Sequence, residues 1–256
     1  MAMQENSHSD FSAAQASTVD PGEVAKFSKL SYEWWDPNGK MAPLHKINPL
    51  RLTYIRDAAC RKFERNVKSL NCLSGLRILD IGCGAGLLCE PLTRLGAQVI
   101  GIDPSASNIA AARLHADKGH LSIDYRCTSV EQMDVRERFD IVLAMEVIEH
   151  VTDLGMFLNR CAAMLKPGGL MVISTINRNW KSFALAIVGA EYILRWLPRG
   201  THQWDKFVTP DELAQHLANN KLSITERAGV IYHPFADRWS LSSDMDVNYM
   251  VVAEGI

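Results

Sequence analysis

Short apolar runs alternate with helical patterns along residues 76–176, and this alternation constrains the fold more than any other feature of the chain. The apolar runs are rich in Ile, Val and Leu and fall at 76–81, 97–103, 122–127, 139–145 and 170–176. Helical patterns separate them at 87–95, 105–117, 129–134 and 153–165. Because a helical crossover makes the next strand run in the same direction, the alternation predicts an α/β fold with a parallel sheet and helices on both faces.

The flanking segments complete a single predicted domain over residues 20–256. A helix is expected from Thr209 to Asn219, and strands at 222–230 and 247–253 bring the predicted sheet to seven strands, mostly parallel. The expected divisions are a disordered leader (1–19), an N-terminal helical cap (20–75), a cofactor-binding core (76–177), a helical insertion after strand 5 (178–208) and a C-terminal sheet part (209–256). Within the cap, D-P-N-G and I-N-P predict interruptions of the helix at 36–39 and 47–49.

The loop after the first predicted strand contains three glycines, in the run I-L-D-I-G-C-G-A-G at 78–86. A dinucleotide fingerprint would need a glycine where Leu87 stands, and no G-K-[ST] follows to make a phosphate-binding loop. Asp80 would repel a pyrophosphate but attract an ammonium or sulfonium group. Asp103, 21 residues beyond Gly82, ends the second strand and suits the two hydroxyls of a ribose. The loop therefore favours S-adenosylmethionine, and the alternative is a structural glycine turn with an incidental aspartate.

Composition excludes several other classes of protein. The net charge is −2, and the chain has neither a basic stripe nor a D/N-P-P-Y motif, so nucleic acid is not expected as a partner. Six cysteines without a C-x-x-C pair indicate free thiols in a reducing compartment instead of disulfides or a zinc site. The first residues lack the apolar core of a secretion signal and the arginines of a transit peptide, which predicts a cytoplasmic protein.

Motifs from about residue 20 to 253 resemble a known family. In order, L-D-I-G-C-G-A-G, G-I-D, A-M-E-V-I-E-H-V and L-K-P-G-G are similar to class I S-adenosylmethionine-dependent methyltransferases. A closer likeness, to the ubiquinone biosynthesis O-methyltransferases, is carried by S-Y-E-W-W-D-P-N-G, P-L-H-K-I-N-P-L-R-L-T-Y-I, S-T-I-N-R-N, V-G-A-E-Y-I-L-R-W-L-P-R-G-T-H and D-V-N-Y-M. The resemblance implies a Rossmann-like fold and methylation of phenolic hydroxyls on polyprenylated aromatic intermediates, 2-polyprenyl-6-hydroxyphenol and 3-demethylubiquinol.

The resemblance also implies cofactor contacts at Arg51, Gly82, Asp103 and Met145, and the glycine loop adds Asp80 and Gly84. Arg51 suits bidentate recognition of a carboxylate, although a solvated helix position is the alternative. Met145 ends the fourth predicted strand, where ligands bind in open α/β sheets, and a methionine there is otherwise core filler. We expect Asp103→Ala to weaken cofactor binding about tenfold or more and to leave folding nearly intact.

The run E-V-I-E-H after the fourth strand supplies the candidate chemical groups Glu146, Glu149 and His150. At spacing i and i+3 the two glutamates would share one helical face, with His150 beside the second. The three suit Mg²⁺ or another divalent cation, which would lower the pKa of a chelated phenol, and the resembled family depends on such a metal. Alternatively His150, with Glu149, acts as the general base without a metal, or the run only starts a solvated helix. Further candidates for the substrate side are Asn177, Arg178, His202, Asn248 and Tyr249.

An apolar segment at 181–199 contains Gly189, Glu191 and Arg195 and is too short and too charged to span a bilayer. We expect a helix that lies on an anionic membrane, at the cytoplasmic face of the inner membrane, or else packs on the protein or at a dimer contact. A quinone-biosynthesis complex is a further expected partner. Two other functions stay open: methylation of another small phenol, and a non-catalytic cofactor-binding subunit, against which the intact Glu149–His150 pair argues.

Overall fold

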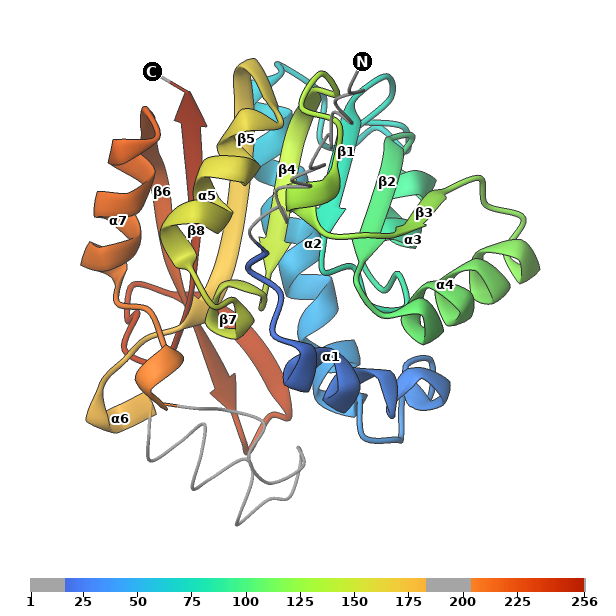
Figure 1. Ribbon diagram of the computed structural model, residues 1–256, viewed down its shortest axis with the longest axis horizontal. Helices are drawn as coiled ribbons and strands as arrows, with labels where there is room; N and C mark the ends of the chain where they lie inside the picture. The colour runs from blue at the N-terminus through green and yellow to red at the C-terminus, as the bar shows by residue number, and fades with distance from the viewer. Residues whose placement is uncertain (1–16, 183–203, 256) are drawn as a thin grey trace, which may run out of the picture.

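The structure, a computed structural model, describes residues 17–182 and 204–255, and one mixed sheet runs through these parts of the chain (Figure 1). Its strands follow the order β3-β2-β1-β4-β5-β8-β6-β7. Their bounds are β1 Arg77–Ile81, β2 Gln98–Asp103, β3 Asp124–Cys127, β4 Phe139–Met145, β5 Leu165–Ile176, β6 Leu222–His233, β7 Arg238–Ser242 and β8 Asn248–Gly255. Strands β1 to β5 pair in parallel, which confirms the alternation that the sequence predicts.

The described residues form eight strands, one more than the seven predicted. The additional strand is β7, which pairs antiparallel with β6 in a hairpin, with Tyr232 opposite Trp239. Both strands of the hairpin are half-exposed near its tip, so the segment 231–242 has no apolar run to reveal a strand. Because β8 is also antiparallel to β5 and β6, the C-terminal part of the sheet is antiparallel and the whole sheet is mixed.

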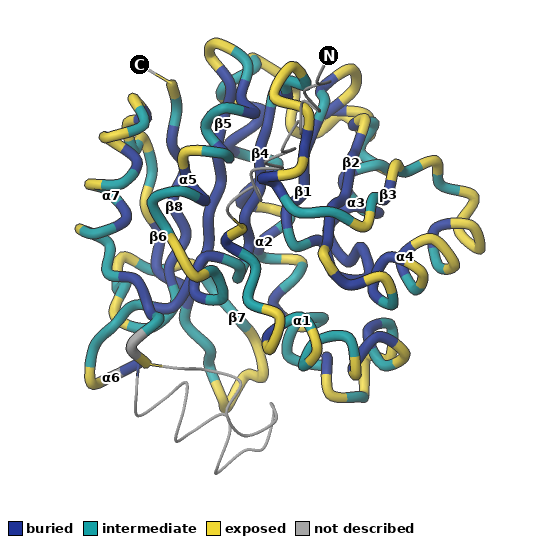
Figure 2. Tube along the Cα trace, in the orientation of Figure 1, coloured by how far each residue is buried: buried dark blue, intermediate teal, exposed yellow. Residues whose placement is uncertain are grey.

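Helices cover both faces of the sheet, as predicted (Figure 1). One core packs against α2 Ala42–Lys62, α3 Cys89–Arg94 and α4 Ala106–Lys118. The other packs against α5 Leu154–Ala163, α7 Pro210–Asn219 and the 3-10 turn η2 Val130–Gln132. Adjacent strand residues serve opposite cores, with Ile78 in the first and Leu79 in the second, because side chains of a strand alternate between faces. Figure 2 shows the resulting band of buried residues along the central strands.

A cap built from the N-terminal residues lies across the carboxyl ends of the parallel strands (Figure 1). It contains α1 Pro21–Ser28, the 3-10 turn η1 Ser31–Glu33 and the first turn of α2. Asp20 begins α1, and its Oδ1 accepts the N–H of Gly22 at 2.9 Å, while proline occupies the first helical position. Just before this cap, Val19 forms an antiparallel bridge with Val151.

Two differences from the predicted boundaries have a clear physical reason. Helix α2 continues through Pro49, where I-N-P predicts an interruption, because buried residues on both sides, such as Ile47 and Ile55, anchor the helix and offset one lost hydrogen bond. Helix α5 ends at Ala163, and β5 begins at Leu165 instead of residue 170. A register shift of β5 against β4 accommodates K-P-G-G within the strand.

The shorter elements are η3 Ile148–His150, α6 Trp180–Ser182 and η5 Trp204–Lys206. Most of the predicted membrane-surface segment, 183–199, lies outside the described residues. Among the residues that are described, no helix combines the length and the apolar character needed to cross a bilayer.

Candidate active site

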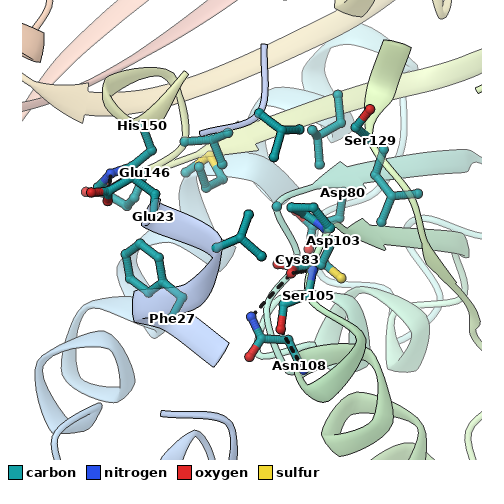
Figure 3. Close-up of a pocket in the computed structure, with 18 of the residues that line it drawn as sticks. Glu23, Phe27, Asp80, Cys83, Asp103, Ser105, Asn108, Ser129, Glu146 and His150 are labelled. Atoms are coloured by element: carbon teal, nitrogen blue, oxygen red, sulfur yellow. Dashed lines mark hydrogen bonds and ion pairs between the residues drawn. The ribbon is translucent and has the colours of Figure 1, made fainter. Parts of the chain in front are cut away.

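A cleft opens where β1, β2 and β4 end, beneath the cap (Figure 3). The strand order reverses between β1 and β4, which is the position where open α/β sheets bind their ligands. The cavity has a volume of about 270 Å³. Figure 3 shows two groups of side chains at its opposite ends. The first end contains Asp80, Asp103, Ser105 and Asn108, and the second contains Glu23, Phe27, Glu146 and His150.

Asp103 ends β2 at the first end of the cleft and is held by three protein donors. Its Oδ2 accepts the N–H of Gly84 at 3.0 Å, and its Oδ1 accepts the N–H of Ser105 at 2.8 Å and Nδ2 of Asn108 at 3.3 Å. Asp103 is 7% exposed, and burial raises the pKa of its carboxyl group despite these hydrogen bonds. A carboxylate accepts about four hydrogen bonds, so Oδ2 keeps one position for a ribose hydroxyl, and a second hydroxyl would replace the long bond from Asn108.

Asp80 lies in β1 beside the same end and is almost fully buried, at 3% exposure. Burial raises the pKa of its carboxyl group to about 6, while the thiol of Cys89, which donates to Oδ2 at 3.1 Å, and the nearby Arg51 lower it in part. A buried carboxylate with so few compensating partners is stabilised by an incoming cation. This environment agrees with the ammonium or sulfonium partner that the sequence predicts for Asp80.

The glycines of the loop allow other protein side chains to approach. Gly82 and Gly84 have φ angles of 68° and 55°, which favour glycine. A Cβ at Gly84 would lie 2.8 Å from Cζ2 and Cζ3 of Trp34, and one at Gly82 would lie 2.6 Å from Cγ2 of Val147. Gly82 lines the cleft, and Gly84 contributes its N–H to Asp103. At Gly84 the side chain that approaches the backbone is therefore Trp34, and direct cofactor contact by Gly84 stays a prediction.

Arg51, which reaches the cleft from α2, is 6% exposed. Its Nη2 lies 3.8 Å from Oε1 of Glu146, and its Nε is buried without a hydrogen-bond partner in the described parts of the chain. A buried guanidinium with unused donors is costly unless a ligand completes its hydrogen bonds. The geometry therefore fits a carboxylate ligand. Met145, 6% exposed, ends β4 and lines the same cleft.

Glu146, Glu149 and His150 all line the cleft, but they do not converge. Glu146 has a φ of 58° and precedes η3, so it does not share a helical face with Glu149. Its Oε1 accepts Oγ of Ser174 at 2.7 Å, while Oε2 of Glu149 accepts Oγ1 of Thr175 at 2.8 Å. Across the described residues, no three acidic, histidine or cysteine side chains are grouped to hold a metal ion. The ligand set predicted for Mg²⁺ is therefore not formed in this arrangement.

His150 instead faces the cap. Its Nδ1 lies 2.9 Å from Oε2 of Glu23, and the ring of Phe27 meets the imidazole edge to face at 5.2 Å between centroids. Burial alone would lower the pKa of His150, but Glu23 and Glu149 together raise it above its ordinary value. The contact with His150 holds the pKa of Glu23 at about 2, and burial raises the pKa of Glu149 to about 7. The second end of the cleft thus contains an imidazole whose pKa is raised and a carboxyl group, Glu149, whose pKa lies near neutral pH.

Sequence reasoning missed the contributions of Glu23, Phe27 and Trp34. All three belong to the cap, whose apolar pattern predicts helices but gives no distance to the cleft. Trp34 stands in a motif that indicated the family resemblance, and nothing local in the sequence marks Glu23. Only the folded chain brings this residue to His150.

The residues predicted for the substrate side have other contacts. Tyr249 is fully buried, and its hydroxyl donates to a backbone carbonyl at 2.9 Å, which makes it a core residue. Arg178 and Asn177 also donate to backbone carbonyls, at 3.1 Å and 2.9 Å. Asn248 begins β8, and His202 lies outside the described residues. Substrate contacts by these last four residues stay predictions.

Comparisons with known proteins agree with this geometry. A family model described as a methyltransferase domain matches residues 52–227. A ubiquinone biosynthesis O-methyltransferase of Bradyrhizobium sp. (strain ORS 278) is 82% identical over 96% of this chain and 97% of its own length. Another, from Rhodopseudomonas palustris (strain BisB18), is 79% identical over 99% of this chain and 98% of its own length.

Solved structures show the same fold at low sequence identity. The crystal structure of magnesium protoporphyrin IX methyltransferase from Synechocystis PCC 6803 with bound SAH is 16% identical, with a TM-score of 0.65 over 91% of this chain and 95% of the other. The same enzyme with bound SAM gives a TM-score of 0.62 at 14% identity, over 91% and 97%. The methyltransferase domain, the high identity over whole chains and the two-ended cleft agree with one another. The chain therefore belongs to the ubiquinone biosynthesis O-methyltransferases, a family of S-adenosylmethionine-dependent enzymes.

Proposed function

We propose that this enzyme methylates a phenolic hydroxyl of polyprenylated aromatic compounds, with 2-polyprenyl-6-hydroxyphenol and 3-demethylubiquinol as its two acceptors. The observation that carries the proposal is the two-ended cleft. One end has acidic groups, Asp80 and Asp103, that suit a cationic donor, and the other has His150 beside apolar side chains of the cap. The names of the relatives support the pathway, since they are ubiquinone biosynthesis enzymes.

At the first end, three side chains would orient S-adenosylmethionine. Asp103 would accept the ribose hydroxyls, Asp80 would attract the ammonium group, and Arg51 would bind the carboxylate through its unused donors. With the cofactor so fixed, its sulfonium methyl group would point along the cleft toward the second end. Orientation of this kind lowers the barrier because the reactants need not find each other during the reaction.

At the second end, the acceptor oxygen would attack the methyl carbon in line with the breaking carbon–sulfur bond. The bond to sulfur breaks as the bond to oxygen forms, so the sulfonium becomes a neutral thioether. We propose that the phenolic proton passes to Nε2 of His150, because Nδ1 faces Glu23. Phe27 of the cap lines this end beside His150 and would contact the aromatic ring while excluding water.

A divalent cation remains a prediction. To bind one together with His150, the carboxylates of Glu146 and Glu149 would have to come together at one point, which they do not do in the described residues. Turnover should be measured after EDTA treatment and again after addition of Mg²⁺, with cofactor binding measured in parallel. Loss and recovery of turnover at constant cofactor affinity would support the cation, whereas full activity in chelator would leave proton transfer to His150 alone.

The proposed function is tested with labelled methyl donor, the purified enzyme and a demethylated quinol with a short prenyl tail. His150→Gln is expected to lower kcat by about 10²- to 10⁴-fold at unchanged cofactor affinity, because it removes the proton acceptor. His120→Gln, at an exposed position after α4, is the matched control. Methylation of a small phenol without any methylation of the prenylated quinol or a prenylated catechol would contradict the proposed acceptors and favour the alternative phenol methyltransferase.

Contact of segment 181–199 with an anionic membrane is proposed from the sequence alone. Liposome co-sedimentation should increase with anionic lipid and decrease with salt, because basic residues would contact the headgroups. Arg195→Glu with Arg199→Glu should reduce it sharply. Absence of binding to liposomes of every composition would contradict this proposal.

A further inference from the structure

Helix α1 brings a buried carboxylate to the wall of the second end of the cleft, which we call the acceptor end because the phenolic acceptor is proposed to bind there. The side chain of Glu23 is 9% exposed, and its Oε1 accepts Nζ of Lys26 at 2.9 Å. Its other oxygen, Oε2, is buried, makes no hydrogen bond within the described parts of the chain and lies at ion-pair distance, 2.9 Å, from Nδ1 of His150. Figure 3 shows the two side chains directed toward each other from separate elements. The carboxylate therefore joins the cap to a group that the proposed function uses.

Stability alone is a weak reason for this arrangement. A buried ion pair must repay the loss of hydration of both charges, and well-packed apolar side chains often stabilise a fold equally well. Glu23 occupies a position where an apolar side chain could pack equally well. It lies between the partly exposed Lys26 and the ring of His150, beside the apolar residues Val24 and Phe27 of the same helix. The contact with the imidazole is thus the feature that distinguishes Glu23 from an apolar anchor.

Helix α1 is also fixed on both sides of Glu23. Before the helix, the N–H of Thr152 donates to the carbonyl of Thr18 at 2.9 Å, two residues beyond His150. At its other end, Oγ of Ser28 lies 2.7 Å from Oγ of Ser105. Because both attachments belong to the walls of the cleft, the position of Glu23 relative to the imidazole is set by the fold.

We propose that Glu23 is a positioning residue for His150: its buried Oε2 pairs with Nδ1 of the imidazole and so presents Nε2 to the phenolic acceptor. The inference rests on the proposed function of His150. A carboxylate at Nδ1 selects one tautomer and one ring orientation, and the edge of Phe27 limits rotation of the ring. Without Glu23 the ring would be free to turn, and a misplacement of about 1 Å is enough to slow an oriented reaction strongly.

The test is a double-mutant cycle of Glu23→Ala and His150→Ala, measured at saturating cofactor and acceptor. In the wild-type background, Glu23→Ala is expected to lower kcat about 10- to 100-fold, because a misplacement of the imidazole by about 1 Å can cost about 10²-fold in rate. KM and the cofactor Kd should change less than about twofold. In the His150→Ala background, Glu23→Ala should have no further effect. Glu23→Gln should retain part of the activity, since its amide oxygen can still accept a hydrogen bond.

The matched control is Glu33→Ala, which removes a more exposed glutamate of the same cap that pairs with Lys40, and it should leave kcat unchanged. Equal losses of kcat in both backgrounds, or a parallel loss of cofactor affinity, would overturn the proposal and make Glu23 only an anchor of α1. No loss in Glu23→Ala would overturn it as well.

Failure of the proposed function has a different signature, namely unchanged kcat in His150→Ala itself. In that case nitrogen-15 spectra of the His150 ring still decide the inference. A protonated Nδ1 in the wild type that is lost or exchanges rapidly in Glu23→Ala would support positioning, and identical ring spectra in the two proteins would overturn it.

Discussion

Replacement of Asp103 by alanine tests the cofactor end of the cleft most directly. The variant would lose the hydrogen bonds from two ribose hydroxyls, each charge-assisted and worth about 1.5–3 kcal/mol. Binding of S-adenosylmethionine should therefore weaken by about 3–6 kcal/mol, or roughly 10²- to 10⁴-fold. The structure also changes the expectation for folding. Gly84 and Ser105 each donate a buried backbone N–H to Asp103, and loss of their acceptor should cost about 1–3 kcal/mol for each donor that water does not reach. Asp103→Ala should therefore lower stability measurably, in contrast to the sequence-based expectation.

Two assays separate the effects of Asp103→Ala. Calorimetric titration with S-adenosylmethionine measures the affinity, and denaturant unfolding without cofactor measures the stability. Asp117→Ala, at an exposed position of α4, is the control and should change neither quantity. If the variant loses stability but binds the cofactor with unchanged affinity, Asp103 only holds the glycine loop, and the assignment of the ribose contact is refuted.

Three further predictions concern the same end of the cleft. Since the folded-state pKa of Asp80 is raised to about 6, its carboxyl group is neutral below that pH, and the affinity for the cofactor should fall about tenfold per pH unit there. Calorimetric titration at pH 7 and at pH 5 checks this prediction. An equally steep decline of affinity in Asp80→Asn would contradict it. Gly84→Ala should cost about 1–3 kcal/mol of unfolding free energy because its Cβ meets Trp34 at a positive φ. Part of that loss should return when Trp34→Ala is added, and strictly additive losses would refute the contact. Arg51→Lys should weaken cofactor binding about tenfold, because an ammonium group cannot form two parallel bonds to a carboxylate, and titration showing unchanged affinity would exclude that role.

The cofactor end could be predicted from the sequence because its signals are local. A buried strand, glycines at the following turn and Asp103 at the end of the next strand all lie within one strand–helix–strand unit. In such a unit the chain direction itself brings the carboxyl ends of the strands to one edge of the sheet. The assignment of Asp80 and Asp103 to one cleft therefore required no long-range information.

The acceptor end could not be predicted in the same way. Glu146 adopts a left-handed φ that no pattern in E-V-I-E-H predicts, and Val147 is not helical either. The two glutamates that the spacing predicts on one helical face are therefore separated. Glu23 faces His150 only because α1 folds back across the strands. Contacts between segments so far apart in the chain depend on the packing of the whole domain. The hydrophobic pattern of either segment alone does not predict them.

The two ends of the cleft are joined by the side chains around Asp103. Asn108 donates to its Oδ1 and accepts Nε1 of Trp34 at 3.2 Å, so the carboxylate is connected to the cap through one side chain. Ser105 donates its N–H to the same oxygen, and its hydroxyl lies 2.7 Å from that of Ser28 at the end of α1. A cofactor that binds Asp103 therefore contacts a group whose partners hold the cap in place, and the same helix carries the carboxylate that faces the acceptor end. Because linked equilibria are reciprocal, a cofactor that is bound more tightly when the cap is in this position also stabilises the cap in this position. The acceptor end should accordingly be best ordered when the methyl donor is bound, which favours binding of the phenol after the cofactor.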